Sequence, residues 1–219
     1  MNKDKKQRYS LSLFVYDVIK FTAAIPGLIW HRPKVHYITP EAKEKHRGGV
    51  LLIANHVGFL DPLYMMYAVW YRRHRFICMK EIMDSWAGWI FRRFLCIPID
   101  RENFSMDSFR EITEHLKNGE LVSMFPEGHV NDGSGRMGTF KSGMVLMAMK
   151  AGVPIVPMYL KGRRHWYQRF QMVMGEAVDI TKIYGERPTF RQIEEITQLL
   201  YRREEELKHY IEQEEPLCP

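Results

Sequence analysis

The chain has 219 residues, of which 46% are hydrophobic, and this is enough for one α/β domain with an ample core. Its three cysteines show neither a disulfide pattern nor metal-ligand spacing, which excludes a disulfide scaffold and indicates a reducing compartment. The net charge of +6 suits contact with anionic lipid or an acidic small molecule. No nucleic-acid motif has the expected spacing, so we expect no nucleic-acid partner.

Residues 1–30 combine a basic lead-in with the most apolar stretch of the chain. Two charges and a Pro-Gly pair interrupt this stretch, so it falls short of a membrane-spanning helix, and the charges argue against a signal peptide. The expected helix over 11–30 is amphipathic, and it can pack on the domain or lie in a membrane interface. Four basic residues within 3–8 favour the membrane, because each is worth about 1 kcal/mol on an anionic surface. The interrupting residues are Asp17, Lys20, Pro26 and Gly27.

Beyond residue 31, apolar runs alternate with helical patterns. The alternation predicts an α/β fold with a mixed, largely parallel sheet flanked by helices, preceded by the N-terminal amphipathic helix. A capping box at Thr189 and Gln192 predicts the start of a long C-terminal helix. The expected strands are 35–38, 49–54, 75–79, 96–99, 121–125, 155–160 and 170–174, and the expected helices between them are 62–71, 82–94, 105–117 and 141–151.

A histidine and an aspartate lie five positions apart in the loop that follows the expected strand 49–54. Asp61 is a good N-cap and Pro62 suits the first helical position, so His56 lies in the loop and Asp61 at its far end. Across a loop the two side chains can meet, and a carboxylate on one imidazole nitrogen leaves the other free to take a proton. The spacing therefore indicates a general base. The alternative is a helix cap beside an ordinary loop histidine.

A second motif, Phe125-Pro126-Glu127-Gly128, ends the expected strand 121–125. It places a carboxylate where a strand meets a loop, and ligands of α/β proteins gather at the carboxyl ends of strands. The alternative is a turn with a solvated Glu127.

Together, the motifs resemble those of the glycerolipid acyltransferase family, whose best-known branch is the lysophosphatidic acid acyltransferases. That family carries Asn-His-x-x-x-x-Asp, an apolar-Asp-Arg block, Phe-Pro-Glu-Gly-Thr-Arg and a Val-Pro-Ile-Val-Pro strand, in this order. The resemblance extends over roughly residues 30–185. The matching positions are Asn55, His56 and Asp61, then 97–101, 125–128 and 153–157.

The resemblance implies an enzyme that moves a fatty acyl group from acyl-CoA or acyl carrier protein to the sn-2 hydroxyl of 1-acylglycerol 3-phosphate in phospholipid synthesis. His56 is the expected base, Asp61 orients it, and Lys80 faces the developing oxyanion. We expect a peripheral or monotopic enzyme on the cytoplasmic face of the membrane, with an interface helix at 1–30 and the acyltransferase domain at 31–219. The histidines show no metal-ligand pattern, so we expect neither metal nor cofactor. The expected substrate-binding residues are Arg101, Glu127, Gly128, His129 and Lys141.

The chain departs from the family pattern at His129 and Val130, which replace Thr-Arg. Neither residue reproduces the bidentate fork that arginine offers to a phosphate, so the acceptor stays open. Glycerol 3-phosphate, another lysophospholipid and a non-phosphate lipid alcohol are alternatives, with Arg101, Arg136 and Lys141 as remaining phosphate partners. Two other classes are a lipid-binding protein without turnover and a thioesterase, in which water replaces the acceptor.

Overall fold

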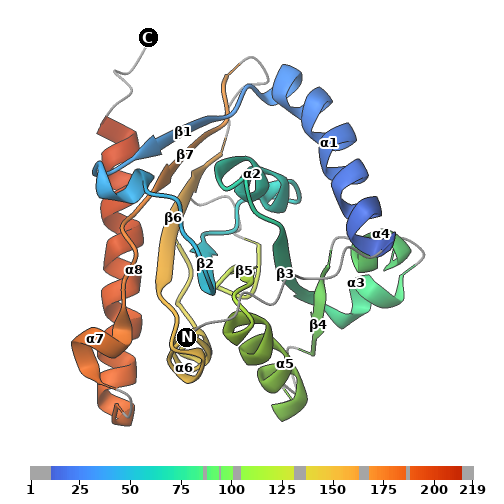
Figure 1. Cartoon of the computed structure of the whole chain (residues 1–219). Coiled ribbons are helices and arrows are strands. Elements are labelled where there is room, and N and C mark those ends of the chain that lie inside the picture. The colour runs from blue at the N-terminus through green and yellow to red at the C-terminus, as the bar shows by residue number, and fades with distance from the viewer. Residues whose placement is uncertain are drawn as a thin grey trace.

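The computed structural model describes residues 11–85, 88–93, 95–100, 105–130, 137–162, 168–185 and 188–213. Strands and helices alternate along the chain (Figure 1). The helices are α1 (Leu11–His31), α2 (Asp61–Ala68), α3 (Lys80–Asp84), α4 (Gly88–Arg93), α5 (Met106–Lys117), α6 (Gly143–Ala151), α7 (Ile180–Tyr184) and α8 (Phe190–Gln213), with a 3-10 turn at Glu41–Lys43. The strands are β1 (Lys34–Tyr37), β2 (Val50–Ala54), β3 (His74–Met79), β4 (Ile97–Ile99), β5 (Leu121–Met124), β6 (Ile155–Lys161) and β7 (Gln171–Met174).

The strands form one seven-stranded sheet in the order β1-β7-β6-β2-β5-β3-β4. All neighbouring pairs are parallel except β6 and β7, which run antiparallel. The prediction of a mixed, largely parallel sheet flanked by helices is therefore confirmed. Because β2, β5, β3 and β4 are parallel neighbours, the loops at their carboxyl ends meet at one edge of the sheet.

Helices cover both faces of the sheet, and each face has its own hydrophobic cluster (Figure 1). The central strand β2 is buried at every position, as expected of a parallel strand with helices on both sides. One cluster joins the sheet to α2 and to Tyr16 of α1. The other joins the opposite face to α5, α6 and α8. Leu52 belongs to the first cluster, and Leu51 and Ile53 belong to the second, as the twofold period of a strand requires.

Helix α1 is held on the domain by its polar face. Tyr16 is buried, and its hydroxyl accepts the backbone N–H of His74 at 3.0 Å. Asp17 Oδ2 pairs with Arg73 Nη2 at 2.6 Å, so one of the charges that interrupts the apolar stretch is neutralised by the domain. By length and composition, the described helix is able to cross a membrane. Exposed apolar residues on its other face are Phe14, Val18, Phe21, Ile25, Leu28, Ile29 and Trp30.

The expected helix over 11–30 is confirmed, and α1 continues through Pro26 and Gly27. Pro26 lies on the exposed side of the helix. Gly27 is buried against α2, and a Cβ there would lie 2.0 Å from the hydroxyl of Tyr67. The glycine thus allows the close approach of two helices.

Other boundaries differ at helix ends. The expected helix 82–94 is two helices, because Ser85 takes an extended backbone after α3 and its hydroxyl donates to the carbonyl of Ile82 at 2.6 Å. The short helix α7 was not expected from the sequence. The capping box is confirmed: the N–H of Thr189 donates to Gln192 Oε1 at 2.8 Å, and the N–H of Gln192 donates to Thr189 Oγ1 at 3.3 Å.

Candidate active site

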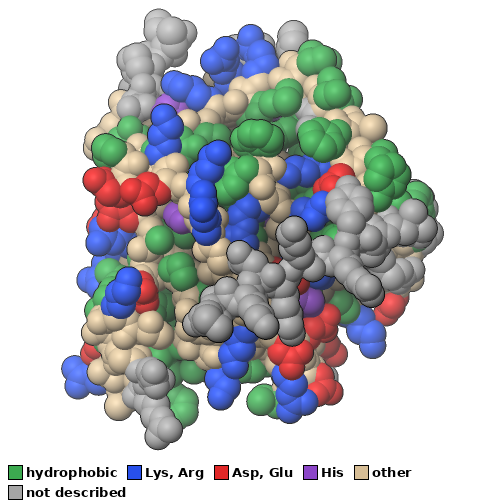
Figure 2. Space-filling model, in the orientation of Figure 1, with side chains coloured by type: hydrophobic (Ala, Val, Ile, Leu, Met, Phe, Trp, Pro, Cys, Tyr) green, Lys and Arg blue, Asp and Glu red, His purple; other side chains and the backbone are tan. Residues whose placement is uncertain are grey.

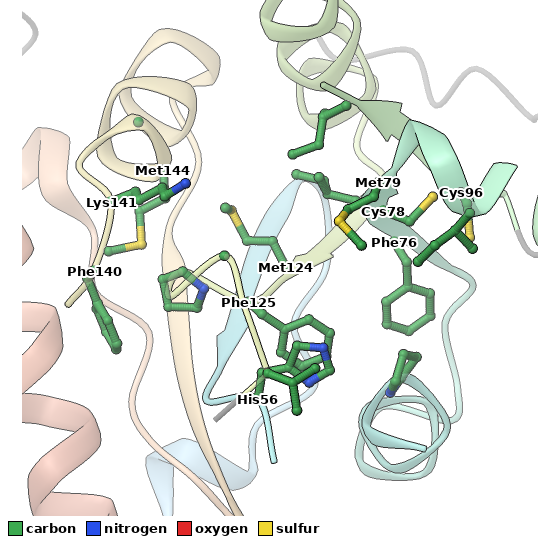
Figure 3. Close-up of a pocket in the computed structure, with 18 of the residues that line it drawn as sticks. His56, Phe76, Cys78, Met79, Cys96, Met124, Phe125, Phe140, Lys141 and Met144 are labelled. Carbon is green, nitrogen blue, oxygen red and sulfur yellow. The ribbon is translucent and has the colours of Figure 1, made fainter. Parts of the chain in front are cut away.

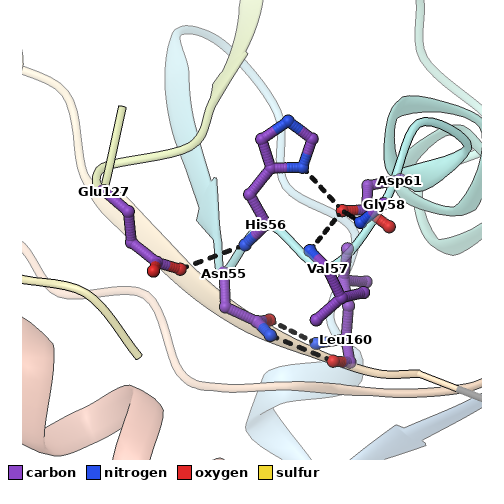
Figure 4. A network of polar contacts seen from close by, with 7 residues as sticks. All are labelled: Asn55, His56, Val57, Gly58, Asp61, Glu127 and Leu160. Atoms are coloured by element: carbon purple, nitrogen blue, oxygen red, sulfur yellow. Dashed lines mark hydrogen bonds and ion pairs between the residues drawn. The ribbon is translucent and has the colours of Figure 1, made fainter. Parts of the chain in front are cut away.

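His56 and Asp61 meet at the carboxyl end of β2 (Figure 4). Nδ1 of His56 lies 2.7 Å from Asp61 Oδ2. Since an ionised carboxylate only accepts, Nδ1 carries the proton and Nε2 is the nitrogen that can take another. Within the described part of the chain, no residue forms a hydrogen bond with Nε2. The arrangement is that of a general base with an orienting carboxylate.

Asp61 does not cap α2, so the N-cap assignment made from the sequence is wrong. It is the first residue of the helix, and Leu60 stands at the cap without a side-chain bond. Asp61 Oδ2 instead accepts the backbone N–H groups of Val57 at 2.7 Å and Gly58 at 2.8 Å. The tight loop turns its own amides onto the carboxylate, which is only 1% exposed. Together with His56, these donors stabilise a charge inside the protein.

Asn55 fixes the loop to the neighbouring strand β6. Its side-chain amide donates to the carbonyl of Leu160 at 3.0 Å and accepts the N–H of Leu160 at 2.7 Å. The buried amide therefore continues the β ladder just past the end of β2 (Figure 4). Its part in the motif is to set where the loop leaves the sheet.

Glu127 is also a loop anchor. It is 2% exposed, and its Oε1 accepts the backbone N–H of His56 at 3.1 Å. Its Oε2 accepts the N–H of Gly138 at 2.6 Å. One carboxylate thus ties together the loops after β2 and β5 and the segment before α6, although His56 and Glu127 are 71 residues apart in the sequence.

The protein buries a third carboxyl group near Glu127, namely Glu204 of α8. Neither oxygen of Glu204 has a hydrogen-bond partner in the described part of the structure. Burial first, and then the charge of Glu127, raise the pKa of Glu204 well above its ordinary value. Burial and the nearby glutamates also raise the pKa of Tyr159.

The imidazole of His56 is stacked on Phe125, with ring centroids 4.0 Å apart and an interplanar angle of 11°. Phe125 follows β5, and the next three residues complete the second sequence motif. The stacking supports one face of the base, so the ring stays in the plane that its bond to Asp61 requires.

His56 opens onto a cavity of about 1070 Å³ that wraps over the carboxyl edge of the sheet (Figure 3). One arm lies on the face covered by α2, and the other lies toward α6. We call them the α2 arm and the α6 arm. The α2 arm is lined by Met66, Phe76, Cys78, Phe91 and Cys96, and the α6 arm by Met124, Phe140, Lys141, Met144 and Met147. Most of these side chains are apolar, which suits a hydrocarbon chain.

Lys80, the predicted oxyanion donor, is not brought to this cavity. Lys80 is exposed at the start of α3 and is absent from the cavity lining, although its neighbour Met79 is part of it. Arg101 lies outside the described residues. The roles of both rest on the family resemblance alone.

Gly128 and Lys141 do line the cavity. Gly128 has a φ of +73°, which favours glycine, and a Cβ there would come 3.1 Å from the ammonium group of Lys141. Lys141 is the one lysine or arginine among the described lining residues. His129 is exposed, and its Nδ1–H donates to the carbonyl of Glu127 at 3.0 Å. Val130, its neighbour in the sequence, lines the cavity.

Sequence reasoning missed Gly138 as a partner of Glu127 and Phe125 as a support for His56. Gly138 lies eleven residues beyond Glu127 in an irregular segment, so no periodic sequence pattern predicts this contact. Phe125 was visible only as an apolar residue before Pro126. Among the described residues, no three His, Cys, Asp or Glu side chains group as ligands for a metal ion.

Comparison with known proteins connects these residues to one family. The family model described as Acyltransferase matches residues 34–161. The chain is 32% identical over 154 residues to the probable 1-acyl-sn-glycerol-3-phosphate acyltransferase of Mycoplasma pneumoniae, covering 68% of this chain and 55% of that protein. It is 31% identical over 167 residues to the 1-acyl-sn-glycerol-3-phosphate acyltransferase of Streptococcus pneumoniae, covering 71% and 60%. The chain thus matches little more than half the length of these two relatives.

The fold is also similar to a solved structure. The crystal structure of the 1-acyl-sn-glycerophosphate (LPA) acyltransferase PlsC from Thermotoga maritima matches with a TM-score of 0.60 and 21% identity. The match covers 94% of this chain and 86% of that one, so nearly the whole architecture is shared.

Proposed function

Because the chain belongs to the Acyltransferase family, we propose that it transfers a fatty acyl group from an acyl thioester to the sn-2 hydroxyl of 1-acylglycerol 3-phosphate. The observation that carries the proposal is the His56–Asp61 pair at the mouth of an apolar cavity. A protein that only binds lipid has no need of an oriented base.

The proposed reaction begins when Nε2 of His56 takes the proton of the acceptor hydroxyl. The oxygen attacks the thioester carbonyl, the tetrahedral oxyanion collapses, and the leaving thiolate takes the proton back from the imidazolium. Asp61 stabilises the imidazolium formed on the way, and no acyl-enzyme is required. An amide or cationic donor must face the oxyanion, and Lys80 stays the candidate that the resemblance suggests.

The charges at the cavity suit an anionic substrate. Lys141 enters the lining beside Gly128, so a phosphate or the polar part of the thioester donor can meet its ammonium group there. Both acyl-CoA and acyl carrier protein are strongly anionic donors, and the proposal covers either. The α2 arm or the α6 arm would hold the hydrocarbon chains.

We place the enzyme on the cytoplasmic face of a membrane, docked through α1. Figure 2 shows hydrophobic side chains gathered over this helix, and seven large apolar residues are exposed on it. A smaller pocket of about 620 Å³ joins the end of α1 to Leu60 and Leu63, which also line the main cavity. An apolar track thus leads from the exposed face of α1 toward His56, as a lipid acceptor requires.

Docking can be tested with the double substitution Phe21→Glu and Ile25→Glu. Both side chains are at least 60% exposed, so the domain should still fold, while binding to anionic phosphatidylglycerol vesicles should fall. The matched control is Phe190→Glu on α8, which is 90% exposed and remote from α1 in sequence. Equal vesicle flotation of all three proteins would contradict docking through α1.

The activity is tested with purified protein, labelled acyl-CoA or acyl carrier protein, and a panel of lysolipids and glycerol phosphates. His56→Ala should lower transfer by on the order of 10²–10⁴, with an unchanged circular dichroism spectrum and thermal midpoint. His209→Ala, an exposed histidine of α8, is the matched control and should retain full activity. Free fatty acid without acylated lipid would indicate a thioesterase, and binding without turnover would indicate a lipid carrier.

The acceptor is tested at Val130, which lines the cavity at the position where the family has arginine. Val130→Arg should improve kcat/KM for phosphate-bearing acceptors over the matched alcohols, because a guanidinium binds phosphate with two parallel hydrogen bonds. An unchanged ratio would mean that Lys141 or another cation already fills this role.

A further inference from the structure

The α2 arm contains two cysteines that the proposed acyl transfer does not use. Cys78 belongs to β3, and Cys96 comes immediately before β4. The strands pair in parallel with Ile77 opposite Ile97 and Cys78 opposite Pro98, which places Cys96 beside Phe76. Since side chains alternate along a strand, Phe76, Cys78 and Cys96 project from the same face. Figure 3 shows both sulfur atoms on this wall of the cavity.

Both thiols are free and line the cavity, so small molecules that enter the cavity can reach them. Their surroundings are apolar, with Phe76, Phe91 and Met66 also in the lining. Such surroundings do not stabilise an isolated thiolate, so a reactive thiol here needs a local partner.

The two side chains are partners of each other. The neighbouring Cys96 thiol lowers the pKa of Cys78, and burial opposes this effect. The Cys78 thiol, together with burial, raises the pKa of Cys96. A pair of this kind has one sulfur prepared to attack and a second that holds the proton, as in the dithiols of oxidoreductases.

We propose that Cys78 and Cys96 form a dithiol that a small disulfide oxidises reversibly inside the α2 arm. The Cys78 thiolate attacks the reagent RSSR, forming a Cys78–SR mixed disulfide and releasing RS⁻. The Cys96 sulfur then attacks Cys78 and forms the Cys78–Cys96 bond. In total, two protein thiols lose two hydrogens, and the reagent is reduced to two RSH molecules.

The bond should change what the cavity accepts. A disulfide fixes its sulfur atoms about 2.05 Å apart and constrains both Cβ positions, so the start of β4 is drawn against β3. The wall of the α2 arm can then no longer adjust to its contents. The transfer rate should therefore fall more with long-chain acyl donors than with short-chain donors. This effect on turnover rests on the proposed acyl transfer, whereas the thiol chemistry does not.

The experiment uses full-length protein with Cys218→Ser, which leaves Cys78 and Cys96 as the only thiols of the three in the sequence. The folded protein is treated with 2-hydroxyethyl disulfide, a small neutral reagent. We expect both thiols to disappear, the intact mass to fall by two hydrogens, and dithiothreitol to restore thiols and activity. With the further substitution Cys96→Ser, one 2-hydroxyethylthio adduct should remain on Cys78.

Two thiols that stay free in the folded protein would overturn the proposal, and so would stable adducts on both cysteines without a cross-link. A disulfide that leaves the rate with long-chain donors unchanged would overturn the effect on the cavity. The proposed acyl transfer fails separately, because it would show as a reduced protein without transfer to any acceptor while the thiol titration and mass still report on the dithiol.

Discussion

Three buried carboxyl groups lie in two different settings, at the strand ends and within α8. Asp61 and Glu127 follow β2 and β5, and backbone N–H groups donate to both of them. Glu204 is equally buried on α8, and within the described structure its oxygens have no donor. Loops at strand ends have amides to offer, whereas the amides in the middle of a helix are already bonded to the helix itself. Position in the fold thus decides which carboxylate can carry charge and hold a site together.

Among substitutions of the buried carboxyl groups and their partners, the largest effect is expected from Asp61→Asn, which keeps the shape of the side chain and removes its charge. An amide cannot stabilise the imidazolium, and it favours the wrong tautomer of His56, so kcat should fall by on the order of 10³–10⁴. Steady-state kinetics measure the loss, and a thermal melt checks that the fold persists. A variant with nearly full kcat would show that Asp61 only anchors the loop.

The next largest loss is expected from Glu127→Gln, because the Glu127 carboxylate accepts hydrogen bonds from two backbone N–H groups. The new NH₂ group must face either His56 N–H or Gly138 N–H, and both are donors. Leaving one donor unsatisfied should lower the unfolding free energy by about 1–3 kcal/mol and reduce kcat through the displaced base. Urea denaturation and kinetics test this, and unchanged stability would refute the anchoring role.

Gly138→Ala should have a smaller effect through the same carboxylate. A Cβ at Gly138 would lie 2.8 Å from Glu127 Oε2, so the segment or the carboxylate must move. We expect a loss of about 1 kcal/mol in unfolding free energy and a weaker hold on the His56 loop. Gly162→Ala is the control, because nothing lies within 4 Å of its Cβ position. Equal stability of both variants would contradict the steric argument.

Glu204→Gln tests the buried carboxyl group of α8, which has no donor in the described structure. Its effect on stability should be the smallest of the four. Because the pKa of Glu204 is raised, the folded protein keeps a proton that the unfolded chain releases. This group therefore makes stability fall as the pH rises above about 4.3, the pKa of a glutamate in the unfolded chain. The amide removes that dependence. Stability should therefore rise at pH 8 and change little at pH 4, as measured by thermal melts across this range. A variant that is destabilised at pH 8 would show that Glu204 is charged and paired.

Much of the fold could be predicted, because strands and helices leave short-range patterns. All seven expected strands are present with each end within one residue of its expected position, and the capping box marks the start of α8. The errors fall where local patterns are weak. Ser85 ends a helix inside a continuous apolar-polar pattern, and Asp61 binds the amides of its own loop instead of capping α2.

The residues of the candidate site could be predicted from the sequence, but many of the contacts between them could not. His56 and Asp61 are near in sequence, so their meeting followed from the loop between them. Which atoms Glu127 would bind did not follow, because its partners are 71 and 11 residues away. The pairing of Cys78 with Cys96 likewise depends on β3 and β4 being neighbours.

The alternation of elements, the His56–Asp61 pair and the family could all be read from the sequence, since each depends on residues close along the chain. The tertiary structure decided that Asp61 turns back to its own loop, that Glu127 joins three segments, and that one cavity spans both faces of the sheet. The physical reason is that hydrogen bonds of buried charges are satisfied by whatever amides the strand order brings near. That order is a property of the packed sheet and not of any single stretch of sequence.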